Sequence, residues 1–96
     1  MTDYILLHHD DASAIDAAGW SPYFAKLRAS GAFSGGSSIG AGQCFRKFGE
    51  IRPVTAKLVG YIRVQAESLD GARAFLTGNP VYEAGGTVEI RELPRD

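Results

Sequence analysis

Residues 58–76 read LVGYIRVQAESLDGARAFL and decide the fold, because they place a strand directly before a capped helix. Hydrophobic residues alternate along 58–66, which is the pattern of a strand with two different faces. Ser68 is a suitable N-cap for a helix over roughly 69–76. The residues expected to face the core are Leu58, Ile62, Val64, Ala72, Phe75 and Leu76.

Strand-like alternation and helix-end signals are also found on both sides of this stretch. The apolar run over 4–9 is typical of a central strand covered on both faces, and 87–93 alternates as a final strand. Ser21 and Pro22 indicate a helix start, and Gly31 indicates its end. A further strand is expected over 43–48, after a glycine-rich stretch, with a turn over 49–55.

The predicted order is strand, helix, strand, strand, helix, strand, within a single domain over 1–96. This order predicts an α+β fold of ferredoxin-like βαββαβ type, an antiparallel sheet with two helices on one face. The other face carries Val59, Tyr61, Arg63 and Gln65, a mixed set that needs a cover. The expected cover is a partner sheet or a lined cavity, and the sheet of a second copy of the chain would give a homodimeric α/β barrel.

Charge and composition exclude several classes of function. The net charge is −1, without the basic excess that nucleic-acid binding needs, and no basic amphipathic or membrane-spanning segment is present. No secretory signal pattern precedes the first strand. The lone Cys44 excludes an internal disulfide and fits a reducing cytoplasm, and no motif calls for a cofactor. We therefore expect a cytoplasmic protein with no nucleic-acid or membrane partner.

Over almost its whole length the chain resembles the YCII-related family, which includes proteins with a DGPF motif. The segments that carry the resemblance are Tyr4-Ile5-Leu6-Leu7, Trp20-Ser21-Pro22-Tyr23-Phe24-Ala25-Lys26-Leu27, Gly60-Tyr61-Ile62, Ser68-Leu69-Asp70-Gly71-Ala72 and the stretch from Asn79 to Arg91. The resemblance implies a dimeric α/β barrel of ferredoxin-like subunits. It also implies enzymatic activity for some members, since one branch is similar to a dehydrochlorinase of chlorinated hydroxyquinols.

The chain departs from the family at the residues that would carry catalysis. Tyr23 stands where the family has a histidine on the first helix, and Asn79-Pro80 replaces an Asp-Pro pair. The region of the DGPF motif reads Arg52-Pro53-Val54-Thr55. Tyrosine and asparagine form hydrogen bonds but do not replace a His-Asp base pair near neutral pH. The resemblance therefore implies the fold more strongly than the chemistry.

His8-His9-Asp10-Asp11 is the first cluster that could carry chemistry. Neighbours on a strand point to opposite faces, so His8 and His9 cannot serve one site. One of them could act as a base beside a carboxylate, but two ligands are too few for a structural metal site, and none is expected. His8, His9 and Tyr23 are the candidate catalytic residues.

A second candidate is a small-molecule pocket with aromatic walls and a few polar groups. The residues expected to bind the ligand are Trp20, Tyr23, Arg46, Tyr61, Asn79, Glu83 and Arg91. The glycine segment 35–42 matches no phosphate-binding motif and is expected to be a bent strand rim, or else a loop that closes over a ligand.

Three functions remain open at this point. The first is a dimeric small-molecule-binding protein without the family His-Asp pair. The alternative is a small cofactor-independent lyase, isomerase or dehydrohalogenase, with His8 or His9 as base and Tyr23 or Tyr61 as acid. A third is a component that acts with another protein through a sheet edge or the tail 92–96, which nothing specific supports.

Overall fold

The computed structural model describes residues 1–95, so Asp96, the last residue of the acidic tail, lies outside the described residues. The strands are β1 (Thr2–His9), β2 (Phe33–Ser38), β3 (Leu58–Ala66) and β4 (Val88–Leu93). The helices are α1 (Trp20–Ser30), α2 (Leu69–Arg73) and α3 (Pro80–Glu83), with 3-10 turns η1 (Ala17–Gly19) and η2 (Ala74–Leu76).

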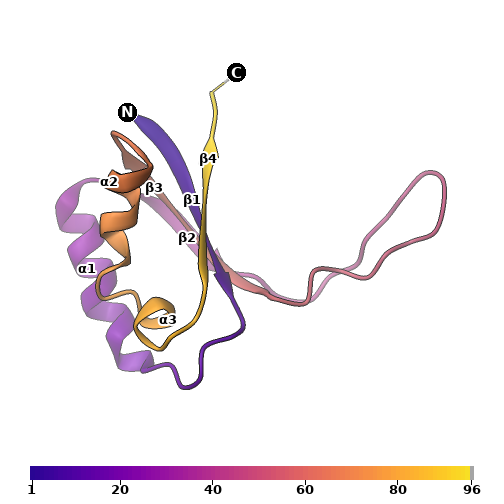
Figure 1. The fold of residues 1–96 in the computed structure, drawn as a ribbon, viewed down its shortest axis with the longest axis horizontal. Coiled ribbons are helices and arrows are strands. Elements are labelled where there is room, and N and C mark those ends of the chain that lie inside the picture. The colour runs from indigo at the N-terminus through magenta and orange to yellow at the C-terminus, as the bar shows by residue number, and fades with distance from the viewer. Residues whose placement is uncertain (96) are drawn as a thin grey trace.

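The four strands form one antiparallel sheet in the order β2-β3-β1-β4. Leu6 in the middle of β1 pairs with Ile62 on β3 and with Ile90 on β4, so β1 is a central strand. The helices lie together on one side of this sheet (Figure 1). The predicted α+β fold of ferredoxin-like type is confirmed.

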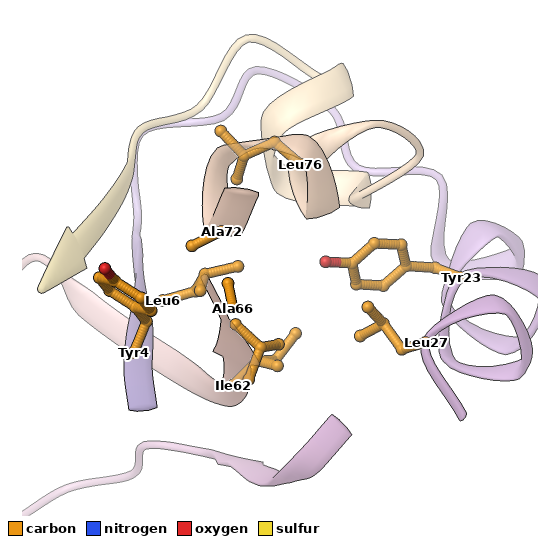
Figure 2. Close-up of a cluster of buried hydrophobic side chains, with 9 residues drawn as sticks. Tyr4, Leu6, Tyr23, Leu27, Ile62, Ala66, Ala72 and Leu76 are labelled. Carbon is orange, nitrogen blue, oxygen red and sulfur yellow. The ribbon is translucent and has the colours of Figure 1, made fainter. Parts of the chain in front are cut away.

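The core lies between the sheet and the helices, where side chains of both layers meet (Figure 2). β1 turns every second residue inward, and α1 contributes Tyr23 and Leu27, which are four positions apart. Each fully buried side chain of this size stabilises the fold by about 1.5–3 kcal/mol. The buried hydrophobic residues of this core are Tyr4, Leu6, Tyr23, Leu27, Ile62, Val64, Ala66, Ala72 and Leu76.

The start of α1 differs from the sequence expectation, whereas its end agrees. The backbone is already helical at Gly19, directly after η1, and α1 begins at Trp20 with no side-chain cap. Ser21 is therefore inside the first turn, and the prediction that it caps the helix is wrong. Gly31 ends the helix with φ +76°, a left-handed conformation that suits glycine.

The second strand lies ten residues earlier than predicted. β2 is Phe33–Ser38, inside the glycine-rich stretch, and the strand expected over 43–48 is wrong. A Cβ on Gly36 would lie 2.5 Å from the carbonyl oxygen of Tyr61, so β2 can approach β3 this closely only with glycine there. Gly35 takes φ +104° where the pairing with β3 shifts its register, as in a β-bulge.

Residues 39–57 form a long loop that projects away from the rest of the molecule (Figure 1). Phe45 and Phe48 are 81% and 77% exposed, which explains why their spacing did not correspond to a buried strand face. Pro53 lies in this loop, but residues 50–55 form no turn, so the turn expected over 49–55 is wrong.

After α2 and η2 the chain forms one further short helix, α3, beyond the helix expected over 69–76. Asn79 caps α3, since its Oδ1 accepts hydrogen bonds from the main-chain N–H groups of Val81 and Tyr82. Pro80 occupies the first helical turn, where its missing N–H is tolerated.

The face of the sheet opposite the helices is half-buried at Ile5, Leu7 and Tyr61 within a single chain. The expectation that β1 is covered on both faces therefore holds on the helix side only. No helix among residues 1–95 is long and apolar enough to cross a membrane.

Candidate functional site

A cavity of about 470 Å³ lies between α1 and the β2–β3 part of the sheet, and we call it the α1–β2 cavity. More of its lining is apolar than polar. Arg28 is the only charged residue that α1 contributes to this lining. The residues that line it are His8, Ile15, Trp20, Phe24, Arg28, Phe33, Gly36, Ser37, Ser38, Val59, Gly60, Tyr61, Ile62 and Val81.

The space exists because the sheet has few side chains here. His8 and Ser38 are both paired with Gly60, so these three residues form a row across β1, β3 and β2 with a glycine in the middle. Gly36 is the next helix-facing residue of β2 and also lacks a side chain. An edge strand of larger residues would fill the volume between α1 and β3.

Aromatic side chains form the helix wall of the cavity. Trp20, Phe24 and Arg28 are spaced four residues apart and therefore lie along one stripe of α1. Trp20 and Phe24 stack with ring centroids 5.6 Å apart. The Arg28 guanidinium lies 5.8 Å from the centroid of Phe24 and 5.6 Å from that of Phe33, within the range of cation–π contact.

His8 is the buried polar group on the floor of the cavity. It is 3% exposed, and its ring makes an edge contact with Trp20 at 5.7 Å between centroids. The amide of Asn79 hydrogen-bonds to Nε2 of His8 at 3.0 Å. A Cβ on Gly60 would lie 3.6 Å from Nδ1, so this second ring nitrogen faces the space above Gly60.

Burial controls the protonation of the two titratable groups at this site. Loss of hydration lowers the pKa of His8, opposed by a hydrogen bond to the main chain of Gly60, so the imidazole is neutral near pH 7. Burial raises the pKa of Tyr23, opposed by the side chain of Asn79. The Tyr23 hydroxyl donates to the carbonyl of Phe75 at 2.8 Å, which ties α1 to η2.

Five of the residues predicted from the sequence meet in this region. His8 and Trp20 line the cavity with their side chains, whereas Tyr61, whose side chain lies beside Leu7 on the open face of the sheet, borders it through its main chain. Tyr23 and Asn79 lie buried behind it, where Asn79 contacts His8 and Trp20 contacts Tyr23 at 6.2 Å between ring centroids. The role of these residues in binding stays a prediction.

Four predicted residues lie elsewhere. Arg46 is in the projecting loop, where it donates to the carbonyl of Glu50. Glu83 is exposed on α3 and accepts a hydrogen bond from the N–H of Gly78. His9 and Arg91 both contact Glu89 on the open face of the sheet, away from the lining of the cavity.

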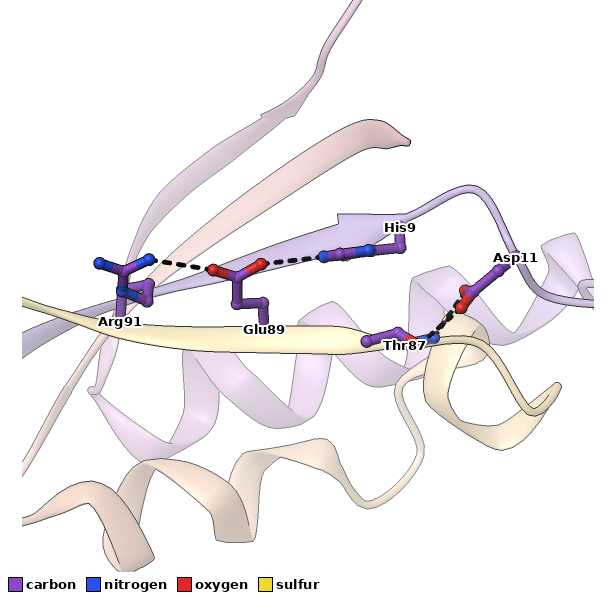
Figure 3. A network of polar contacts seen from close by, with 5 residues as sticks. All are labelled: His9, Asp11, Thr87, Glu89 and Arg91. Carbon is purple, nitrogen blue, oxygen red and sulfur yellow. Dashed lines mark hydrogen bonds and ion pairs between the residues drawn. The ribbon is translucent and has the colours of Figure 1, made fainter. Parts of the chain in front are cut away.

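The open face carries a polar chain in which Glu89 joins His9 at 3.0 Å and Arg91 at 3.1 Å (Figure 3). These contacts lower the pKa of Glu89, and the hydrogen bond to His9 has the largest effect. Beside them, Asp11 accepts hydrogen bonds from the hydroxyl and N–H of Thr87, which lower the pKa of Asp11. The placement of His8 and His9 on opposite faces agrees with strand alternation.

Sequence reasoning missed Phe24, Arg28, Phe33 and Gly60 as members of the site. The spacing of Trp20, Phe24 and Arg28 was visible, but it had to be combined with the position of β2, which was placed too late in the chain. Within residues 1–95, no group of three or more His, Cys, Asp or Glu side chains could hold a metal ion.

Comparisons with known proteins support the fold. No family model matches the chain, and no curated protein matches it in sequence. A solved structure of 5-chloro-2-hydroxyhydroquinone dehydrochlorinase from Burkholderia phenoliruptrix AC1100, in complex with 2,5-dihydroxybenzoquinone, has a similar fold. The TM-score is 0.61 and the identity 15%, over 98% of this chain and 95% of that chain. This chain therefore shares the ferredoxin-like fold of that protein, and the resemblance stated above is supported at the level of the fold.

Proposed function

We propose that this protein is a YCII-related, homodimeric, cytoplasmic protein that binds a small planar molecule in the α1–β2 cavity. The observation that carries the proposal is the cavity itself, with aromatic walls on α1 and the buried His8 on its floor. A volume of about 470 Å³ is within the usual range for small-molecule sites. The dehydrochlorinase of similar fold holds a quinone, a planar ring of the size that this cavity would admit.

Binding without catalysis fits the environment of His8. A general base needs a free lone pair, but Nε2 of His8 is occupied by the amide of Asn79. Tyr23 is a candidate acid, but its hydroxyl donates to the carbonyl of Phe75, and burial raises its pKa. These groups are arranged to hold the fold and a ligand rather than to move a proton.

The alternative is a cofactor-independent lyase, isomerase or dehydrohalogenase that uses His8 as base. It is favoured by the position of His8 in the cavity lining and by the activity of the protein of similar fold. His9 is a poor candidate, because it contacts Glu89 on the other face of the sheet. An enzyme of this class would convert a chlorinated hydroxyquinol, whereas a binding protein would only be stabilised by it.

A thermal-shift screen tests the proposal. The probes are 2,5-dihydroxybenzoquinone, aromatic carboxylates and aliphatic carboxylates of similar charge. We expect the aromatic probes to raise the melting temperature of the wild type but not that of Gly60→Ala, whose added methyl group would enter the space beside His8. Ser38→Phe is a second blocking variant on the neighbouring strand, and Gly40→Ala is the control outside the cavity. If no aromatic probe shifts the wild type, the proposed function is wrong.

A further inference from the structure

The polar groups at the two ends of the α1–β2 cavity indicate which class of ligand it binds. This inference rests on the proposed binding function. The cavity has one polar group toward each end of its helix wall. His8 contacts Trp20 at the start of α1, and Arg28 lies two turns later, beside Phe33. Eight residues of helix rise about 12 Å, so the two groups are well separated along the wall.

The hydrogen bonds around Asn79 decide which proton His8 carries. Oδ1 of Asn79 accepts from two main-chain N–H groups at the start of α3, at 3.0 Å and 3.2 Å. Its Nδ2 group, a donor only, is therefore the end that faces His8 at 3.0 Å. Nε2 of His8 must accept this bond, so the proton of the neutral ring is on Nδ1, the nitrogen that borders Gly60 and hydrogen-bonds to its main chain at the edge of the cavity.

Arg28 supplies the opposite end with a positive charge. Its guanidinium lies over Phe24 and Phe33, and none of the ion pairs found within residues 1–95 involves it. A guanidinium held against two aromatic rings keeps its N–H groups available for a carboxylate. The aromatic rings between the two ends favour a flat, apolar body.

We propose that the cavity takes an elongated planar aromatic carboxylate, with the carboxylate at Arg28 and a second oxygen that shares the Nδ1 proton of His8 with the main chain of Gly60. Asn79 is the positioning residue that makes His8 a donor. A carboxylate at position 79 would instead accept a proton from Nε2 and turn the lone pair of Nδ1 toward the cavity. The chain thus uses asparagine to select a ligand oxygen that accepts a hydrogen bond.

The tautomer of His8 can be measured without any ligand. Nitrogen-15 NMR of the imidazole rings at pH 8 should show His8 protonated on Nδ1 in the wild type and on Nε2 in Asn79→Asp. The Asp variant keeps an acceptor for the α3 cap, so it should remain folded. A wild-type His8 protonated on Nε2 would overturn the proposal and would favour the enzyme alternative.

The ligand class is tested with three probes on one scaffold: 6-methoxy-2-naphthoate, its neutral carboxamide and the corresponding methylammonium cation. By calorimetry we expect the anion to bind the wild type tightest, and Arg28→Gln and Asn79→Asp each to weaken it about tenfold. Lys26→Gln removes the same charge from an exposed α1 residue outside the cavity and should leave the affinity unchanged.

The outcomes separate this inference from the proposed function. If the carboxamide or the cation binds as well as the anion, the ligand class is wrong while small-molecule binding stands. If Lys26→Gln weakens the anion as much as Arg28→Gln does, the attraction is general to the helix surface and the role of Arg28 is wrong. If none of the three probes nor the quinone binds, both the ligand class and the proposed function fail.

Discussion

The side-chain amide of Asn79 lies 3.0 Å from Nε2 of His8, although the two residues are 71 positions apart in the sequence. The same amide caps α3 through its oxygen. One buried side chain therefore connects the last helix to the central strand of the sheet, and it is completely excluded from solvent. The stability of the fold and the hydrogen-bonding state of His8 in the cavity therefore depend on the same residue.

Replacement of Asn79 should separate these two roles. Asn79→Ala removes the α3 cap and leaves Nε2 of His8 without a partner, so we expect a loss of about 2–4 kcal/mol in the free energy of unfolding. Asn79→Asp keeps the cap and should lose clearly less. Urea denaturation at pH 8 measures both. Equal losses for the two variants would contradict the role of the cap.

His8 should make the protein less stable as the pH falls. Its folded pKa is lowered by burial, so below about 6.5, the ordinary value for histidine, the unfolded chain binds a proton more readily than the folded chain. The stability present above pH 6.5 is then lost progressively toward the folded pKa. His8→Gln should flatten the curve of unfolding free energy against pH between 7.5 and 5.

Below this window, the carboxyl groups with lowered pKa, those of Asp3, Asp11 and Glu89, lose their stabilising contributions in both proteins, so they do not disturb the comparison. His9 is also common to both. If wild type and His8→Gln have parallel curves from pH 7.5 to 5, the buried neutral state of His8 is wrong.

The sequence predicted the strands and helices whose hydrophobic residues recur with a clear period. It did not predict the elements whose geometry depends on a neighbouring strand. Hydrophobic residues alternate along the strand over 58–66 and recur at helical spacing after Ser68, and the structure has a strand and a helix at these places. β2 was missed because its residues FSGGSS have no hydrophobic alternation. What makes it a strand is the close approach of Gly36 to Tyr61, which only the paired structure shows.

The candidate site was predictable only in part for the same reason. Trp20, Tyr23 and Asn79 were singled out as residue types suited to a pocket, and they lie close together with His8. Arg46, Glu83 and Arg91 were chosen on equal grounds but lie in other parts of the fold. Residue chemistry selects candidates, whereas the distance between them depends on strand register and loop length.

Gly36 should be among the glycines least tolerant of substitution. In Gly36→Ala the new Cβ would lie 2.5 Å from a main-chain oxygen of β3, so β2 must move away and lose hydrogen bonds. We expect a loss of about 1–3 kcal/mol in the free energy of unfolding. Gly40→Ala meets no atom within 4 Å and should change stability by less than about 0.5 kcal/mol. Comparable losses in the two variants would disprove the close approach.

The open face of the sheet should hold a second copy of the chain. Leu7 lies at its centre, between Tyr61 on β3 and Glu89 on β4, and is half-buried in a single chain. Light scattering at micromolar concentration should therefore give the mass of a dimer. Leu7→Lys should weaken the dimer at least about tenfold, because a charged side chain at the centre of the interface is costly to desolvate.

The lysine is chosen so that the subunit itself stays folded, since Glu89 is the cross-strand neighbour of Leu7 and can pair with the new charge. Lys26→Glu, a charge change on the exposed side of α1, is the control and should leave the mass at that of a dimer. A monomeric wild type would show that the half-buried face needs no cover. A dimer that persists in Leu7→Lys would instead place the interface elsewhere, with the projecting loop and its exposed Phe45 and Phe48 as the next surface to substitute.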